Sequence, residues 1–155
     1  METTKTSEGV GATQSAKLLY TAKAHTTGGR DGGASRTSDG RLDVKFTLPG
    51  APGNGTNPEQ LFAAGWSACF LGAIRHVAAA MKVRLPPDPA IDAEVDLLNG
   101  DGGYFLQARL NVSLPGLDRQ VAQAILEGAH KTCPYSKATQ GNIHVEVKLI
   151  DTGTA

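Results

Sequence analysis

The sequence has no excess charge of either sign and no long uninterrupted apolar run. Its formal net charge is zero, with 15 basic and 15 acidic residues, and no three basic residues are consecutive. Bulk charge therefore does not favour binding to nucleic acid or to an anionic membrane. The most apolar stretch, 61–81, is interrupted by Gly65, Gly72, Arg75 and His76. A membrane span needs about 20 nearly uninterrupted apolar residues, so we expect none here.

Cysteine is also scarce, since the chain has only Cys69 and Cys133. Two thiols are too few for the disulfide framework of a small secreted domain, and a chain of 155 residues folds without one. Residues 1–15 are polar and lack the apolar core of a secretory signal. We therefore expect a cytoplasmic protein, in which thiols stay reduced unless they take part in redox chemistry.

The pattern of apolar residues predicts one α+β domain over 17–155, after a flexible N-terminal tail over 1–16 that is rich in Ser, Thr and Gly. Alternation of apolar and polar residues predicts strands, and longer apolar segments with capping signals predict two main helices. The expected strands are 17–25, 34–38, 42–48, 91–98, 104–114 and 143–150, and the expected helices are 57–81 and one that follows Asp118.

The first helix has clear start signals. Asn57 suits the N-cap, Pro58 suits the first helical position, and Gln60 completes a capping box. Glu59 lies in the first turn, where the helix dipole favours an anion. The segment is apolar over most of its circumference, so we expect the helix to be largely buried.

Cys69 lies about three turns inside this helix. A thiol reacts with peroxide as its thiolate, and apolar burial raises the thiol pKa. The helix dipole fades within the first turn, so a nearby cation must activate Cys69. The candidates are Arg30, Arg75, His76 and Lys137. Arg30 is favoured because its glycine-rich surroundings allow the backbone to bend, and Glu59 is a plausible partner for its guanidinium.

Cys133 precedes Pro134, which disfavours helical geometry at the cysteine and predicts the end of the second helix. A short helical turn after it would direct backbone N–H groups toward a thiolate. Two other readings stay open at this point. The cysteines are either small buried hydrophobes, or they form a zinc set with His76 and His130.

Three motifs in order resemble the organic hydroperoxide resistance (Ohr) proteins of the OsmC superfamily. They are GGRDG at 28–32, TNPEQLFAAGWSACF at 56–70, and CPYSKAT at 133–139 followed by GNI at 141–143. The similarity extends over about 18–150. The OsmC branch, with a broader substrate range, is the alternative within the superfamily. One departure is Trp66, where tyrosine is more usual.

The resemblance implies an OsmC-like fold of antiparallel sheets packed on two main helices, in an intertwined homodimer with active sites at the subunit interface. It implies a peroxidase in which Cys69 is the peroxidatic thiol and Cys133 the resolving thiol. Arg30 and Glu59 correspond to the pair that holds the peroxidatic cysteine as thiolate. The resemblance requires no cofactor and suggests a lipoylated protein as the dithiol donor.

Apolar residues around Cys69 favour alkyl or lipid hydroperoxides over hydrogen peroxide as the substrate. We expect Phe62, Trp66 and Phe70 to form the substrate pocket. A different class of function remains as an alternative, in which the domain binds a hydrophobic ligand and the thiols are idle.

Overall fold

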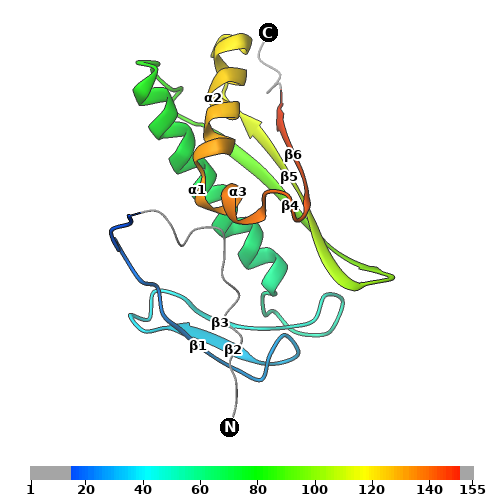
Figure 1. Cartoon of the computed structure of the whole chain (residues 1–155). Coiled ribbons are helices and arrows are strands. Elements are labelled where there is room, and N and C mark those ends of the chain that lie inside the picture. The colour runs from blue at the N-terminus through cyan, green and yellow to red at the C-terminus, as the bar shows by residue number, and fades with distance from the viewer. Residues whose placement is uncertain (1–14, 151–155) are drawn as a thin grey trace.

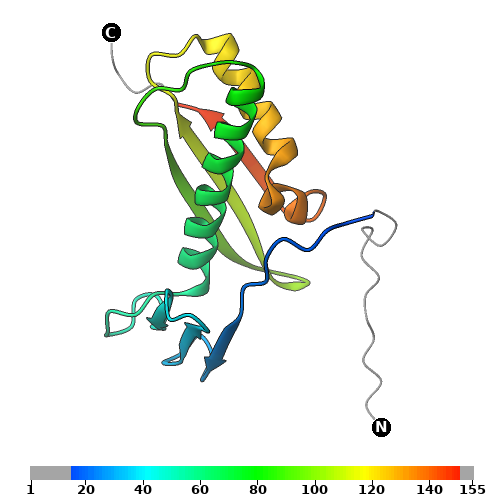
Figure 2. The ribbon, with the colours of Figure 1, turned by 90° about the vertical axis from the view of Figure 1, so that its left-hand side faces the viewer.

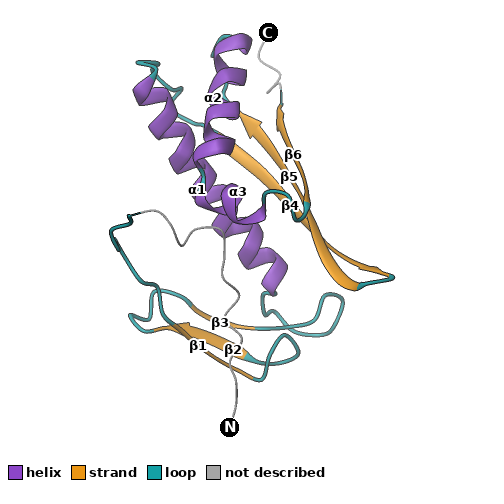
Figure 3. Cartoon of the chain, viewed as in Figure 1, coloured by secondary structure: helices purple, strands orange, loops and turns teal. Residues whose placement is uncertain are grey.

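The computed structural model describes residues 15–150, which form two sheets and three helices (Figures 1 and 3). The predicted tail, 1–16, lies almost wholly outside the described residues. The elements in chain order are β1 (Ala24–Thr27), β2 (Ala34–Thr37), β3 (Asp43–Lys45), α1 (Pro58–Ala80), β4 (Ala90–Gly100), β5 (Gly103–Ser113), α2 (Arg119–Thr132), α3 (Pro134–Thr139) and β6 (His144–Leu149).

The larger sheet has the strand order β4-β5-β6 and corrects the prediction of antiparallel sheets. β4 and β5 form a long antiparallel hairpin, whereas β5 and β6 pair in parallel, with Ala108 opposite Val145. Parallel neighbours need a crossover connection, and α2 and α3 supply it between β5 and β6. The smaller sheet, β1-β2-β3, is antiparallel throughout its described strands.

The two long helices lie side by side on one face of the larger sheet (Figures 1 and 2). Alternate β5 residues Ala108, Leu110 and Val112 face the helices and are buried. The opposite face is polar: Arg109 binds both carboxylate oxygens of Asp96, at 2.6 and 2.9 Å. This ion pair lowers the pKa of Asp96 to about 2. The period-2 alternation therefore separates a core face from a solvent face.

α1 begins as the sequence predicts. The Oδ1 atom of Asn57 accepts a hydrogen bond from the Gln60 backbone N–H at 2.9 Å, and Pro58 occupies the first helical position. Gln60 does not return a bond to the backbone of Asn57 in the manner of a full capping box. Its Oε1 atom instead accepts the hydroxyl of Thr56 at 2.8 Å.

The burial of α1 is less complete than predicted. One stripe packs into the core, while the opposite side, which includes Ala64, Ala68 and Gly72, is exposed. By length and composition α1 could also cross a membrane, a test that the core helices of ordinary domains pass as well. Its packing against α2 and β4 is that of a core helix. The buried residues of α1 are Trp66, Phe70, Ala73, Ile74 and Ala78.

The strand predicted over 17–25 is a further correction, because only Ala24–Thr27 is a strand. The segment 15–23 begins to one side of the helices and runs down to β1 (Figure 2). Leu18, Leu19 and Tyr20 are 79%, 86% and 76% exposed. Their alternation predicts a buried face, but nothing within the described chain covers them, and a strand also needs a hydrogen-bonding neighbour.

Candidate functional site

The two thiols meet where α1 passes the junction of α2 and α3. Cys69 is partly buried on α1, and Cys133 is completely buried between α2 and α3. Both are free thiols, and they lie within hydrogen-bonding reach of one another. As Pro134 predicts, Cys133 leaves helical geometry, with φ −61° and ψ 123°. The fold thus brings together two cysteines that are 64 positions apart, one accessible and one enclosed.

The surroundings of Cys69 favour the protonated form of its thiol within the described chain. Burial raises the pKa of Cys69, and the neighbouring Cys133 thiol raises it further. One group acts in the opposite direction: the backbone N–H of Tyr135, in the first turn of α3, hydrogen-bonds to the sulfur and lowers the pKa. The sequence predicted that α3 amides would serve Cys133, whereas this amide serves Cys69.

Arg30 and Glu59 pair as the sequence predicts. The Nη2 atom of Arg30 lies 2.6 Å from Oε1 of Glu59 at the start of α1. The hydrogen bond from Arg30 lowers the Glu59 pKa, so this carboxylate remains charged at neutral pH. The β1–β2 turn that presents Arg30 depends on glycine: a side chain at Gly33 would collide with the carbonyl oxygen of Gly29.

The Arg30–Glu59 pair is not among the groups that shift the pKa of Cys69 within the described chain. The pKa of Cys69 is set by burial, by Cys133 and by Tyr135, and Arg30 is not among these influences. The guanidinium is instead 40% exposed and directed at Glu59. The sequence-predicted role of Arg30 as the activator of Cys69 therefore stays a prediction.

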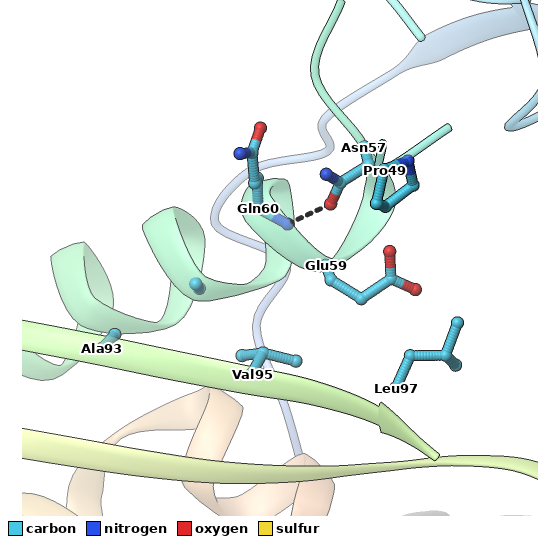
Figure 4. Close-up of a pocket in the computed structure, with 8 residues that line it drawn as sticks. Pro49, Asn57, Glu59, Gln60, Ala93, Val95 and Leu97 are labelled. Carbon is cyan, nitrogen blue, oxygen red and sulfur yellow. Dashed lines mark hydrogen bonds between the residues drawn. The ribbon is translucent and has the colours of Figure 1, made fainter. Parts of the chain in front are cut away.

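An open groove of about 380 Å³ lies beside Glu59, between the start of α1 and β4 (Figure 4). Glu59 extends from the helix toward the side of Leu97, and Val95 forms part of the apolar floor. The groove is lined by Pro49, Asn57, Glu59, Gln60, Ala63, Ala93, Val95 and Leu97. None of the cysteines and none of the three aromatic residues predicted to form the pocket lines it.

Of those three aromatic residues, two belong to the core instead. Trp66 and Phe70 have no exposed surface, because both belong to the hydrophobic core. Trp66 bonds to Ser136 on α3, and the Phe70 ring packs near His130 on α2. Their rings therefore cannot contact a substrate in this conformation. Phe62 is only partly buried, and its ring meets those of Trp66 and Tyr135 edge to face, at centroid distances of 5.5 and 6.0 Å.

The described residues do not support the alternative of a zinc site. Among residues 15–150, no group of three or more His, Cys, Asp or Glu side chains is placed to hold a metal ion. His130, one of the proposed ligands, has its Nδ1 atom 3.1 Å from Oγ of Ser136.

Comparison with known proteins agrees with this arrangement. A family profile described as OsmC-like protein matches residues 50–148, which include both cysteines and Glu59. The chain belongs to the OsmC-like family. An organic hydroperoxide resistance protein of Xanthomonas axonopodis pv. citri is 48% identical to it over 137 residues, covering 86% of this chain and 96% of that protein.

Other relatives of this OsmC-like protein carry the same description. The organic hydroperoxide resistance protein OhrB of Bacillus subtilis is 44% identical over 136 residues, covering 84% of this chain and 98% of that protein. Its crystal structure matches with a TM-score of 0.80, covering 86% of this chain and all of that one. A structure from Legionella pneumophila, with 42% identity, gives 0.81 over 87% of this chain and all of the other. The predicted resemblance to Ohr proteins is therefore confirmed.

One residue of the site was missed by sequence reasoning. Tyr135 appeared only as part of the motif CPYSKAT, yet it supplies the backbone N–H that contacts the Cys69 sulfur. Its position two residues after Cys133, directly after the Pro134 that ends α2, was the available signal. The contact itself joins α3 to α1 and is not visible in local sequence.

Proposed function

We propose that this protein is a cysteine-based peroxidase that reduces organic hydroperoxides to alcohols. The observation that carries the proposal is the meeting of a partly accessible thiol, Cys69, with an enclosed thiol, Cys133. A structural pair of buried cysteines needs neither the accessibility of the first nor its contact with the second. The names of the bacterial relatives supply the class of substrate.

The reaction uses the two thiols in sequence. The Cys69 thiolate attacks the terminal oxygen of the hydroperoxide, so that a sulfur–oxygen bond forms as the oxygen–oxygen bond breaks. The alkoxide takes up a proton and leaves as the alcohol, and Cys69 becomes a sulfenic acid. The Cys133 thiolate then attacks the sulfenic sulfur, a disulfide forms, and hydroxide leaves and is protonated to water. The buried position of Cys133 suits this second role.

A dithiol donor must return the disulfide to two thiols. Each exchange step passes through a mixed disulfide, which requires access to a sulfur. Cys69 is the more accessible of the two sulfurs, since Cys133 has no exposed surface. We propose a lipoylated protein in the cytoplasm as the donor, as the family resemblance suggests.

We further propose that the working unit is a homodimer whose sites combine residues of two chains. Three observations on the single chain support this. The apolar residues Leu18, Leu19 and Tyr20 are exposed, and one side of α1 is uncovered. Arg30 is not among the described groups that shift the pKa of Cys69. A second copy would cover the apolar surface and bring its own Arg30–Glu59 pair to Cys69.

Mass spectrometry after one equivalent of cumene hydroperoxide tests the reaction. The intact reduced protein should lose two hydrogens as Cys69 and Cys133 join, while cumyl alcohol appears in equal amount. The variant Cys133→Ser should still form alcohol once and hold a sulfenic acid that dimedone traps. A protein that only binds hydrophobic ligands would leave both the mass and the hydroperoxide unchanged, and the proposal would fail.

A further inference from the structure

The surface next to Cys69 is shaped by a glycine one turn earlier in α1. In a helix the Cα–Cβ bonds tilt toward the N-terminus, so the side chain of Cys69 leans toward the turn that holds Gly65. Gly65 presents no side chain there. The phenol of Tyr135 occupies the space: a Cβ atom on Gly65 would lie 2.7 Å from its hydroxyl oxygen and 3.3 Å from its ring carbon Cζ.

The contact with Tyr135 therefore explains why residue 65 is a glycine, and no such contact explains the second glycine of the same helix. Glycine inside a helix costs about 0.5–1 kcal/mol relative to alanine. At Gly72, also within α1, an added Cβ would meet no atom within 4 Å. The cost at Gly65 is offset by the close approach of Tyr135, whereas Gly72 makes no comparable contact within the described chain.

Tyr135 is held at both of its ends. Its backbone N–H contacts the Cys69 sulfur, and its ring packs edge to face on Phe62 with a centroid distance of 6.0 Å and an interplanar angle of 77°. The residue is nevertheless 38% exposed, while Trp66, which also packs edge to face on Phe62, has no exposed surface. Tyr135 and Phe62 are thus the aromatic rings near the thiol that remain accessible to a ligand.

We propose that Tyr135 is a positioning residue that aligns Cys69 and its hydroperoxide, and that Gly65 is the space that allows it. The backbone amide fixes the sulfur, and the ring, seated over Gly65, forms the wall that receives the organic group. This inference rests on the proposed peroxidase function. It replaces the buried Trp66 and Phe70 with Tyr135 and Phe62 as the residues that distinguish an organic hydroperoxide from hydrogen peroxide.

The test compares Gly65→Ala with the control Gly102→Ala, on the β4–β5 turn, where an added Cβ would meet no atom within 4 Å. Single-turnover oxidation of Cys69 is measured in each full-length protein. Gly65→Ala should displace the Tyr135 ring and slow reaction with cumene hydroperoxide by about tenfold, since small misplacements cost this much or more. Reaction with hydrogen peroxide, which has no organic group, should change by less than about threefold on the same reasoning. Gly102→Ala should behave as the unaltered protein.

The double variant Gly65→Ala with Tyr135→Phe supplies the rescue. Removing the hydroxyl eliminates the 2.7 Å contact, so the shorter phenylalanine side chain should return to its place over residue 65. Most of the rate with cumene hydroperoxide should then be restored. Tyr135→Ala alone should abolish the preference for cumene hydroperoxide over hydrogen peroxide. Equal losses with both substrates, a failure of Tyr135→Phe to rescue, or an unaltered Gly65→Ala protein would each overturn the proposal.

Alkylation of the Cys69 thiol separates this proposal from the peroxidase function. In a Cys133→Ser background, Gly65→Ala should slow the aromatic reagent monobromobimane more than the small reagent iodoacetamide. This readout needs no peroxidase activity. If the unaltered protein fails to consume any hydroperoxide, the proposed function fails while the alkylation ratio still reports on Tyr135. If the ratio of the two alkylation rates does not change, the Tyr135 ring does not form a wall beside Cys69, and the proposal is wrong.

Discussion

The indole N–H of Trp66 donates a hydrogen bond to the Oγ atom of Ser136 at 3.2 Å, joining α1 to α3 in the interior. Both residues are essentially inaccessible to solvent. Because the Ser136 hydroxyl accepts from Trp66, its own proton is available to the Nδ1 atom of His130, 3.1 Å away on α2. Hydrogen bonds among Trp66, Ser136 and His130 therefore connect all three helices beside the segment that carries Cys133 and Tyr135.

Removing this hydroxyl should destabilise the protein more than its size suggests. Ser136→Ala leaves the buried Trp66 N–H without a partner, which costs about 1–3 kcal/mol. Trp66→Phe in the same background removes that unpaired donor, so the two effects should couple and not add. Urea unfolding of the two single variants and the double variant measures the coupling. Ser67→Ala, whose hydroxyl bonds only to the carbonyl oxygens of the preceding turn of α1, is the control.

The end of α1 contains a backbone strain that a single substitution should relieve. Lys82 has φ 55°, and the bonds from its N–H to Ala79 and from Val83 to Ala78 form the terminal motif in which glycine is usual. Lys82→Gly should raise the free energy of unfolding by about 0.5–1 kcal/mol, after the greater freedom of glycine in the unfolded chain is subtracted. Lys82→Ala keeps the strain and should leave the midpoint of thermal unfolding almost unchanged. A lower midpoint for the glycine variant would contradict this interpretation.

The pH dependence of Cys69 alkylation should reveal whether Arg30 activates this thiol. Burial and Cys133 raise the Cys69 pKa above its ordinary value of 9.0, and no cation among the described residues is a cause that lowers it. If a second chain supplies Arg30, Arg30→Ala removes a charge that favours the thiolate. The Cys69 pKa then rises, the alkylation profile moves to higher pH, and the rate at pH 7 falls by about tenfold or more.

The control for this measurement is Arg41→Ala. Arg41 is highly exposed and pairs with Asp39 in the turn between β2 and β3, which is not the turn that holds Arg30. Its alkylation profile should match that of the unaltered protein. Glu59→Gln should produce a smaller shift than Arg30→Ala, because Arg30 keeps its charge and loses only the partner that orients it. An Arg30→Ala profile identical to that of the unaltered protein would exclude Arg30 as the activating cation.

Sequence reasoning succeeded where the determining signals are local. Asn57 with Pro58 starts α1, and Pro134 ends α2, because caps and proline act through the neighbouring backbone. It failed where pairing is non-local. The parallel contact of β5 with β6 depends on how the α2–α3 crossover returns to the sheet, and no residue of 143–150 marks that choice.

The site divides in the same way. Cys69, Cys133 and the Arg30–Glu59 pair were recognised from motifs and charge, and the structure confirms the contact of the two thiols and of the ion pair. Two of the three residues predicted to form the pocket, Trp66 and Phe70, are buried, because an apolar residue next to a reactive one on a helix is equally suited to the core. Trp66 is such a residue. The contact of Tyr135 with Gly65 joins two elements and becomes visible only once α3 is placed against α1.

Mixing two inactive subunits should decide whether each site is shared between chains. Cys69→Ser lacks the nucleophile and Arg30→Ala lacks the cation. If Arg30 of one chain acts on Cys69 of the other, a mixed dimer assembles one complete site and one site without either group. Coexpression of the two variants with different affinity tags, followed by selection for both tags, should therefore restore about half of the activity per dimer, as expected when one of two sites is intact. If Arg30 acts within its own chain, both sites of the mixed dimer lack a group, and the purified mixture should be no more active than Arg30→Ala alone.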